Sequence, residues 1–307
     1  EWYRYHGNKA YLEQSRDYII ALLRQLMTQI APDGQECLDG TRFLDWPSNS
    51  NKDAIAAGLQ ALMVWGMRVG VEFAELFKDR QLSNDCKAAE KKLVKAASKV
   101  YKKFLASCPA PDAPGSKQVA ALMAITGLID APKADKEFLS INGAQGFSTF
   151  YGYYMLEAMA AAGNFQGALD VIREYWGAMI DLGATSFWED FDINWIPNAA
   201  PIDELVPEGK KDIHGDCGAY CYVGFRHSLC HGWASGPTSW LSRHILGVEV
   251  LEPGCRQVRI TPHLGDLQWV KGTFPTPYGE IQIYHERQAN GNVISEVKAP
   301  KEVSVIK

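Results

Sequence analysis

Several features that mark whole classes of protein are missing from this 307-residue sequence. Its net charge is −5 and its lysines and arginines form no stripe, so we expect no nucleic-acid partner. No uninterrupted apolar run reaches the roughly 18–20 residues of a membrane span, and Glu1 begins no signal peptide, so we expect no membrane partner. The seven cysteines are an odd set without a Cys-x-x-Cys pair, which argues against a disulfide framework and a zinc ribbon.

Two cysteines and two histidines could still be imagined together as a metal site, namely Cys217, Cys221, His214 and His231. Their spacing favours small buried residues near a pocket over metal ligands. We therefore expect neither a metal nor another cofactor.

The composition is that of a globular protein, with 47% apolar and 22% charged residues. Its start is unusual, because residues 1–6 resemble the last turns of a helix that Gly7 closes, and Asn8 is a good N-cap for another. A chain that opens on the end of a helix is expected to be a fragment. Missing N-terminal domains of the same protein would then be its partners.

Apolar residues recur at helical spacing up to about Leu246. The helices predicted from them cover residues 11–30, 55–69, from Asn84 or Asp85 to Pro109, 117–129, 147–162, 165–182 and 233–245. Short Gly-Asn turns between helices favour a toroid or solenoid of helix pairs. We predict a helical domain over residues 1–246.

The pattern changes to strands after Gly247. The predicted strands are 258–260, 267–274, 280–287 and 293–297, and Asn290-Gly291 predicts a type I′ hairpin between the last two. Residues 247–307 are therefore expected to form a small antiparallel β-sandwich domain that packs on the helices because it is marginal alone.

One stretch of ten residues, GATSFWEDFD at 183–192, combines three carboxylates with three aromatic rings. Burial of charge is costly, so a core segment would contain the rings without the acids, and a surface turn would contain the acids without the rings. A sugar-binding cleft needs both, because a pyranose ring has an apolar face and a rim of hydroxyls. Polar groups also lie beside aromatic residues at 43–47, 147–154 and 231–233, in or near long loops at 31–51 and 190–216.

Glu189 is the candidate general base, because flanking rings partly desolvate its carboxylate and make it a better proton acceptor. The alternative is that Glu189 caps or salt-bridges the following helix. His231 could likewise be a hydrogen-bonded core histidine, and Trp188 and Trp233 plain core residues.

GATSFWEDFD resembles the Gly-Ala-Thr-Thr-x-Trp-Glu-x-Trp signature of bacterial α-L-rhamnosidases, which are inverting glycoside hydrolases with an (α/α)₆ toroid. SLCHGWAS at 228–235 is similar to that family's Ser-Leu-x-His segment, and LDW at 44–46 to its Gly-Asp-Trp. Four further segments resemble the part of the family's sequence that leads into its C-terminal β-sandwich. They are RHILGV at 243–248, PG at 253–254, VRI at 258–260 with Pro262, and GTFPTPYG at 272–279. The resemblance runs from Glu1 to about Tyr284.

The resemblance implies a mainly α fold, an (α/α)₆ toroid incomplete at its N-terminus, followed by the β-sandwich. It puts Glu189 on the general base, His231 on a pocket histidine, and Asp45 and Trp46 on sugar-contacting positions. Trp188 and Trp233 would add apolar surface, and Asp190 a hydrogen bond. The family's acidic general-acid motif is absent, and about eight predicted helices fall short of the twelve of a closed toroid.

The function expected from this resemblance is hydrolysis of terminal α-L-rhamnosyl linkages with inversion, on a rhamnose-containing glycoside or polysaccharide. Without its general acid, the chain alone is expected to be inactive on ordinary rhamnosides. The alternatives are a non-catalytic carbohydrate-binding fragment and another (α/α)₆ glycosidase. A periplasmic or extracellular location fits such an activity better than the cytoplasm.

Overall fold

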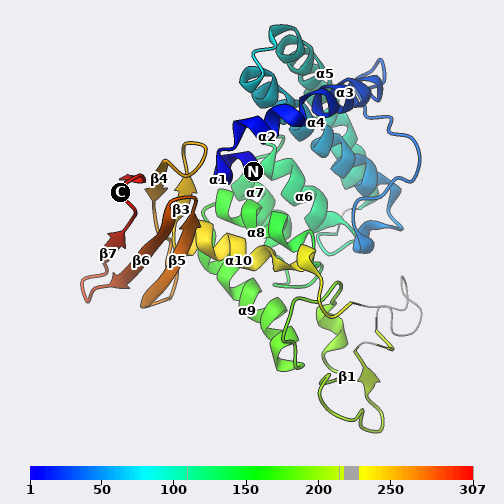
Figure 1. Cartoon of the computed structure of the whole chain (residues 1–307). Helices are drawn as coiled ribbons and strands as arrows, with labels where there is room; N and C mark the ends of the chain where they lie inside the picture. Colours follow the sequence, from blue (N-terminus) through cyan, green and yellow to red (C-terminus); the bar gives the residue numbers. More distant parts are fainter. Residues whose placement is uncertain (109, 214, 218–227, 307) are drawn as a thin grey trace. The chain divides into compact units, whose positions relative to one another are not determined.

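A computed structural model describes residues 1–108, 110–213, 215–217 and 228–306 (Figure 1). The chain divides into two compact units: Glu1–Asp17 with Pro237–Lys307, and Tyr18–Gly236. The first unit thus combines both ends of the chain. The domain boundary expected between residues 246 and 247 stays a prediction.

The second unit is built from helices joined by long loops. Its α-helices are α3 (Arg16–Thr28, which begins in the first unit), α4 (Lys52–Leu76), α5 (Arg80–Ser107), α6 (Ser116–Ile125), α7 (Ala131–Ala134), α8 (Gly152–Ala161) and α9 (Phe165–Asp181). A π-helical turn, η2 (Asp135–Leu139), continues α7, and the loops hold the 3₁₀ turns η1 (Trp46–Ser48), η3 (Ile193–Trp195) and η4 (Gly232–Ser235). A parallel two-stranded sheet, β1 (Ala199–Ala200) with β2 (Lys211–Asp212), lies between η3 and η4 in the chain.

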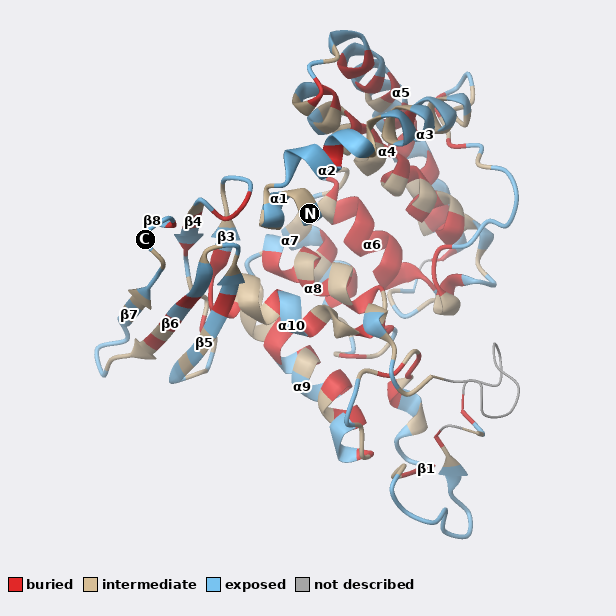
Figure 2. Cartoon of the chain, viewed as in Figure 1, coloured by how far each residue is buried: buried red, intermediate tan, exposed pale blue. Residues whose placement is uncertain are grey.

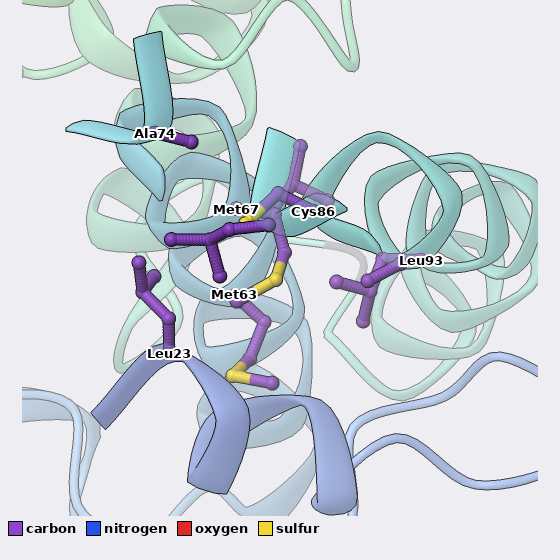
Figure 3. Packing of buried hydrophobic residues seen from close by; sticks show 9 residues of the cluster. Leu23, Met63, Met67, Ala74, Cys86 and Leu93 are labelled. Atoms are coloured by element: carbon purple, nitrogen blue, oxygen red, sulfur yellow. The ribbon is translucent and has the colours of Figure 1, made fainter. Parts of the chain in front are cut away.

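A methionine-rich core joins α3, α4 and α5 (Figure 3). Met63 and Met67 from α4 pack with Leu23 from α3 and with Cys86 and Leu93 from α5, all of them buried. Flexible thioethers fill irregular gaps well, which suits a contact between three helices. Gly70 allows the close approach, since a Cβ there would lie 2.7 Å from the Cys86 sulfur.

The predicted helices occur, but several of their boundaries differ; the helix expected from residue 147, for example, begins only at Gly152. The helix predicted over residues 11–30 is interrupted at Ser15, which separates α2 (Lys9–Gln14) from α3. The start expected at Asn84 or Asp85 is wrong: α5 begins at Arg80, because the Asp79 side chain accepts the backbone N–H of Leu82. Aspartate and asparagine are both good N-caps, so Asp79 was as strong a local candidate as Asn84 or Asp85.

Helix α4 has the length and mean hydropathy of a membrane span, the one helix in the described ranges that does. Interruptions such as Gln60 and Arg68 hide this from a search for uninterrupted apolar runs. Its most apolar window is 56% buried within the protein, as in a helix that forms a core.

The first unit holds two three-stranded sheets beside short helices. The helices are α1 (Trp2–His6), α2, α10 (Gly236–Trp240) and the π-helical turn η5 (Leu241–Ile245). One sheet has the order β3-β4-β8, from Val248–Val250, Gln257–Ile260 and Ser304–Ile306; the other has the order β5-β6-β7, from Trp269–Thr276, Gly279–Arg287 and Val293–Lys298. Exposed residues alternate with less exposed ones along β5, and buried residues recur at every second position in the middle of β6 (Figure 2).

The pairing departs from the expected antiparallel arrangement in one place, because β8 pairs with β4 in parallel. The other pairings of the two sheets are antiparallel. Buried side chains of both sheets, among them Val258, Ile260, Phe274, Ile281 and Ile283, form one core. The predominantly helical fold with a following small β unit is confirmed.

The turn between β6 and β7 is not the expected type I′. A type I′ turn needs positive φ at both central residues, whereas Gly291 has φ 86° and Asn290 is not among the described residues with positive φ. The Gly291 N–H instead donates to the Gln288 carbonyl, and the Gln288 N–H to that of Asn292. This is the longer hairpin loop that places a left-handed glycine at a bulge.

Candidate active site

Asp45 begins the 3₁₀ turn η1 in the first long loop. Its Oδ1 accepts the Trp46 N–H at 3.0 Å, and its own N–H donates to the Ser48 hydroxyl at 3.1 Å. Asp45 and Ser48 form a capping box, in which the cap and the turn satisfy each other's free groups. The sequence therefore fixes the orientation of Asp45 locally.

The other oxygen of Asp45 is held by distant parts of the chain. Oδ2 accepts the Ser148 hydroxyl at 2.6 Å and the Gln118 amide at 2.9 Å, and Asp45 is 3% exposed. Burial raises the pKa of Asp45 to about 6, against the lowering effect of these hydrogen bonds; the charge of Asp190 raises it further. Asp45 thus joins the first loop to α6 and to the turn before α8.

Glu189 lies in the GATSFWEDFD stretch with its backbone fixed on both sides. Its N–H donates to the Ser228 carbonyl at 2.9 Å. Its own carbonyl accepts two donors, the Thr149 hydroxyl at 2.5 Å and the Trp233 indole N–H at 2.7 Å. Such double acceptance holds the residue in one place before any substrate arrives.

The Glu189 carboxylate remains partly accessible, with 14% of its side chain exposed. Oε2 accepts the Ser228 backbone N–H at 3.0 Å and lies 3.8 Å from Nδ1 of His231, whose side chain is 34% exposed. The His231 backbone N–H donates to the Phe187 carbonyl at 2.7 Å, which ties the histidine to the same stretch. The carboxylate and the imidazole therefore lie side by side, and both are partly accessible.

Aromatic rings form one side of this cluster. The His231 ring lies 4.5 Å from that of Trp233, which stacks on Phe150 at 5.3 Å between centroids. Trp233, like Trp46, is partly exposed. Near Trp46, Phe43 makes an edge contact at 5.0 Å.

The two other residues of the predicted site lie deeper. Trp188 is 0% exposed and packs edge-on against Phe191, and Asp190 is 3% exposed with Oδ1 accepting the Phe191 N–H at 3.0 Å. Contact of either residue with a sugar stays a prediction. Trp188 offers no exposed ring surface here, as the core alternative expects.

The structure brings the predicted residues into one connected cluster. The consecutive residues Ser148 and Thr149 make the link, because the first binds Asp45 and the second binds Glu189. The aromatic pattern at 147–154 pointed to this segment. No signal identified Gln118, which is buried in an alanine-rich helix where its role depends on tertiary contacts.

The imagined metal site receives no support from the described residues. His214 and Cys221 lie outside them, while Cys217 is buried and His231 contacts Glu189. Within the described ranges, no group of three or more histidine, cysteine, aspartate or glutamate side chains is arranged to bind a metal.

A separate surface pocket of about 520 Å³ lies at the turn between α4 and α5. Its lining includes Glu75, Lys78 and Lys87 and none of the predicted site residues. The pocket is lined mostly by charged residues and is open to solvent. The candidate active site is instead the cluster that contains Asp45, Glu189 and His231.

A family model matches the C-terminal part of the chain, where the sequence resembles the α-L-rhamnosidases. Residues 247–306 match the family described as the bacterial alpha-L-rhamnosidase C-terminal domain. None of the curated proteins matches the sequence.

Solved structures match along the whole chain. A rhamnosidase of glycoside hydrolase family 78 from Bacillus sp. GL1 has a TM-score of 0.71 at 21% identity, over 100% of this chain and 31% of that one. The α-L-rhamnosidase from Aspergillus terreus has a TM-score of 0.72 at 16% identity, over 99% and 34%. That from Streptomyces avermitilis, solved with L-rhamnose, has a TM-score of 0.69 at 19% identity, over 99% and 28%.

This chain therefore spans about a third of the length of the structures it matches. Its architecture, helices followed by a small β unit, is similar to part of these rhamnosidase structures. More particularly, it has the fold of the C-terminal part of the α-L-rhamnosidases, and residues 247–306 carry that family's C-terminal domain, which confirms the resemblance noted in the sequence.

Proposed function

We propose that Glu189 is the general base in the hydrolysis of terminal α-L-rhamnosyl linkages with inversion. The observation that carries this proposal is the state of the Glu189 carboxylate: it is partly exposed, oriented by the Ser228 N–H, and 3.8 Å from His231. The likeness to α-L-rhamnosidases supports the class of substrate, and the structure from Streptomyces avermitilis contains L-rhamnose.

Inversion requires two carboxyl groups about 6.5–9.5 Å apart with a water molecule between them. Glu189 takes a proton from that water while the water oxygen forms a bond to the anomeric carbon. At the same time the bond between the anomeric carbon and the leaving oxygen breaks, and a general acid protonates the leaving oxygen. Asp45 is unsuited to be this acid, because both of its oxygens face donors of the protein itself.

The proposed substrate is a rhamnose-containing glycoside or polysaccharide. The partly exposed rings of Trp46 and Trp233 would contact the apolar face and the methyl group of rhamnose. His231 would hydrogen-bond a hydroxyl, and Asp45 and Asp190 would act from below the surface by holding the loops in place.

The test uses the 307-residue chain and two substrates, a 2,4-dinitrophenyl and a methyl α-L-rhamnoside. The dinitrophenolate leaves without protonation, so the missing acid, worth about 10²–10⁴-fold, affects it least. We expect slow release of dinitrophenol and β-L-rhamnose as the first product in the proton NMR spectrum, with negligible turnover of the methyl glycoside. Rhamnose binding without any release of dinitrophenol would support the non-catalytic alternative instead.

A further inference from the structure

The sheet β5-β6-β7 carries an ordered array of side chains on the face opposite the core. Strand register aligns Trp269 with Glu286 and Glu286 with Ile294 in one row. The same register aligns Lys271 with Tyr284 and Tyr284 with Glu296 in the next. These six residues are called the outer array below.

Alternation along the strands places the array away from the protein interior. Phe274, Ile281 and Ile283 point to the other face and belong to the core, so that face is already closed. Trp269 is 61% exposed and Ile294 46%. A Trp ring this exposed contributes little to folding and is available to a ligand.

The two aromatic rings of the array are diagonal neighbours. Residues directly opposite each other in a sheet lie about 4.5–5.5 Å apart and diagonal ones about 7–8 Å, still within reach for large side chains. Trp269 and Tyr284 therefore offer two adjacent ring surfaces. Tyr284 and Glu286 are two residues apart on β6, so their side chains lie next to each other on the same face of the sheet.

Polar groups surround both rings. Tyr284 has Lys271 opposite it on β5 and Glu296 opposite it on β7. Trp269 has Glu286 opposite it on β6. The array thus combines flat apolar surface with one amine and two carboxylates at the same level, which matches the apolar face and hydroxyl rim of a pyranose.

We propose that the outer array is a saccharide-binding surface, distinct from Glu189, that takes the pyranose rings of a neutral glycan chain on Trp269 and Tyr284. This proposal does not rest on the function proposed for Glu189. With Lys298 of the next row, the face around the two rings carries two amines and two carboxylates, so it has no net charge to attract an acidic glycan. A bound chain would lie across β5 and β6, with Lys271 and Glu286 hydrogen-bonding its hydroxyls.

The composition of the array argues for a saccharide over other occupants. The buried centre of a protein interface is depleted in charge, whereas here the charged residues lie directly beside the rings. A surface that lies on a membrane carries basic residues on its polar side, and the carboxylates of Glu286 and Glu296 oppose that use.

Affinity electrophoresis of the full 307-residue chain tests the proposal. Native gels contain a soluble neutral rhamnan, a soluble neutral glucan, or no polysaccharide. We expect retardation in at least one polysaccharide gel, and about tenfold weaker affinity for Trp269→Ala and for Tyr284→Ala. The matched control is Tyr18→Ala, since Tyr18 is an aromatic residue that is 70% exposed on α3.

Two further samples separate this surface from the candidate active site and from self-association. Glu189→Gln should be retarded like the wild type, and sedimentation of the wild type and Trp269→Ala should be equal. No retardation of the wild type in either polysaccharide, or retardation that both array variants retain, would overturn the proposal. So would retardation abolished by Glu189→Gln, or a dimer that Trp269→Ala dissociates.

Discussion

Asp45 and Glu189 are both carboxylates on long loops, but the protein holds them in opposite ways. Asp45 is 3% exposed, and three protein donors engage its two oxygens. Glu189 is held mainly through its backbone, whose N–H and carbonyl make three hydrogen bonds. Its side chain accepts one backbone N–H and stays 14% exposed.

The difference separates two uses of an acid next to aromatic rings. A buried carboxylate with every donor matched joins loops, because leaving such a donor unpaired is costly. A carboxylate with a fixed backbone and a partly accessible side chain can exchange a proton with a ligand. The sequence analysis expected both residues in the site, Glu189 as the general base and Asp45 as a sugar contact.

The largest expected effect is on the buried side of this comparison. Replacement of the fully buried Trp188 by alanine should lower the free energy of unfolding by about 3–5 kcal/mol through lost contacts and a cavity. Urea unfolding followed by far-UV circular dichroism measures it. A loss below about 1 kcal/mol would mean that Trp188 is not a core residue and has surface to offer a sugar.

A second prediction concerns the pH dependence of stability. Burial raises the pKa of Asp45 from 3.8 to about 6, so between these values the folded state binds more protons than the unfolded state. The stability that Asp45 contributes is therefore greatest at low pH and falls as pH rises through this window, by roughly 3 kcal/mol.

Comparison with Asp45→Asn isolates this contribution, because asparagine keeps an acceptor and does not titrate. The difference in unfolding free energy between the wild type and Asp45→Asn should change across pH 4–6 in the stated direction. Equal pH profiles for the two proteins would show that Asp45 is not a buried titrating group.

A smaller effect is expected at the backbone of Glu189. Thr149→Val removes one of two donors to its carbonyl, so the carbonyl keeps the indole N–H of Trp233 and the loss should be about 0.5–1.5 kcal/mol. Trp233→Phe is the reciprocal variant. The double variant leaves the Glu189 carbonyl unpaired, so its loss in unfolding free energy should exceed the sum of the two single losses. Urea unfolding measures all three. A strictly additive result would contradict the sharing of one carbonyl by the two donors.

The smallest effect is expected on the accessible side. Glu189→Gln keeps an oxygen for the Ser228 N–H, so the free energy of unfolding should stay within about 0.5 kcal/mol of the wild type. Thermal unfolding measures the difference. A loss above about 2 kcal/mol would assign Glu189 to the structural class that contains Asp45.

Local patterns in the sequence carried much of the fold. Period-3.6 apolar residues identify α4, α5 and α9, and alternation identifies β5, β6 and β7. Pairings between distant segments gave no such signal: β8 is three residues long and is stabilised by a parallel pairing with β4. The start of α5 was a local signal that the prediction missed, because Asp79 caps the helix through the N–H of Leu82, three residues further on.

The candidate site divides in the same way. The combination of acids and rings in GATSFWEDFD and the histidine segment pointed to Glu189, His231 and Trp233, which the structure brings together. The partners of Asp45 were not predictable, because Gln118 and Ser148 become its donors only when α6 and the turn before α8 fold against the first loop.

The most direct test of the central claim is turnover of 2,4-dinitrophenyl α-L-rhamnoside by the chain and by Glu189→Gln, with and without azide. If Glu189 activates water, the variant should lose about 10²–10⁴-fold in rate. Azide should then restore the rate, because it attacks without giving up a proton, and the product should be β-L-rhamnosyl azide. A variant that keeps near-normal turnover, or one that azide leaves unchanged, would contradict the assignment of Glu189 as the base.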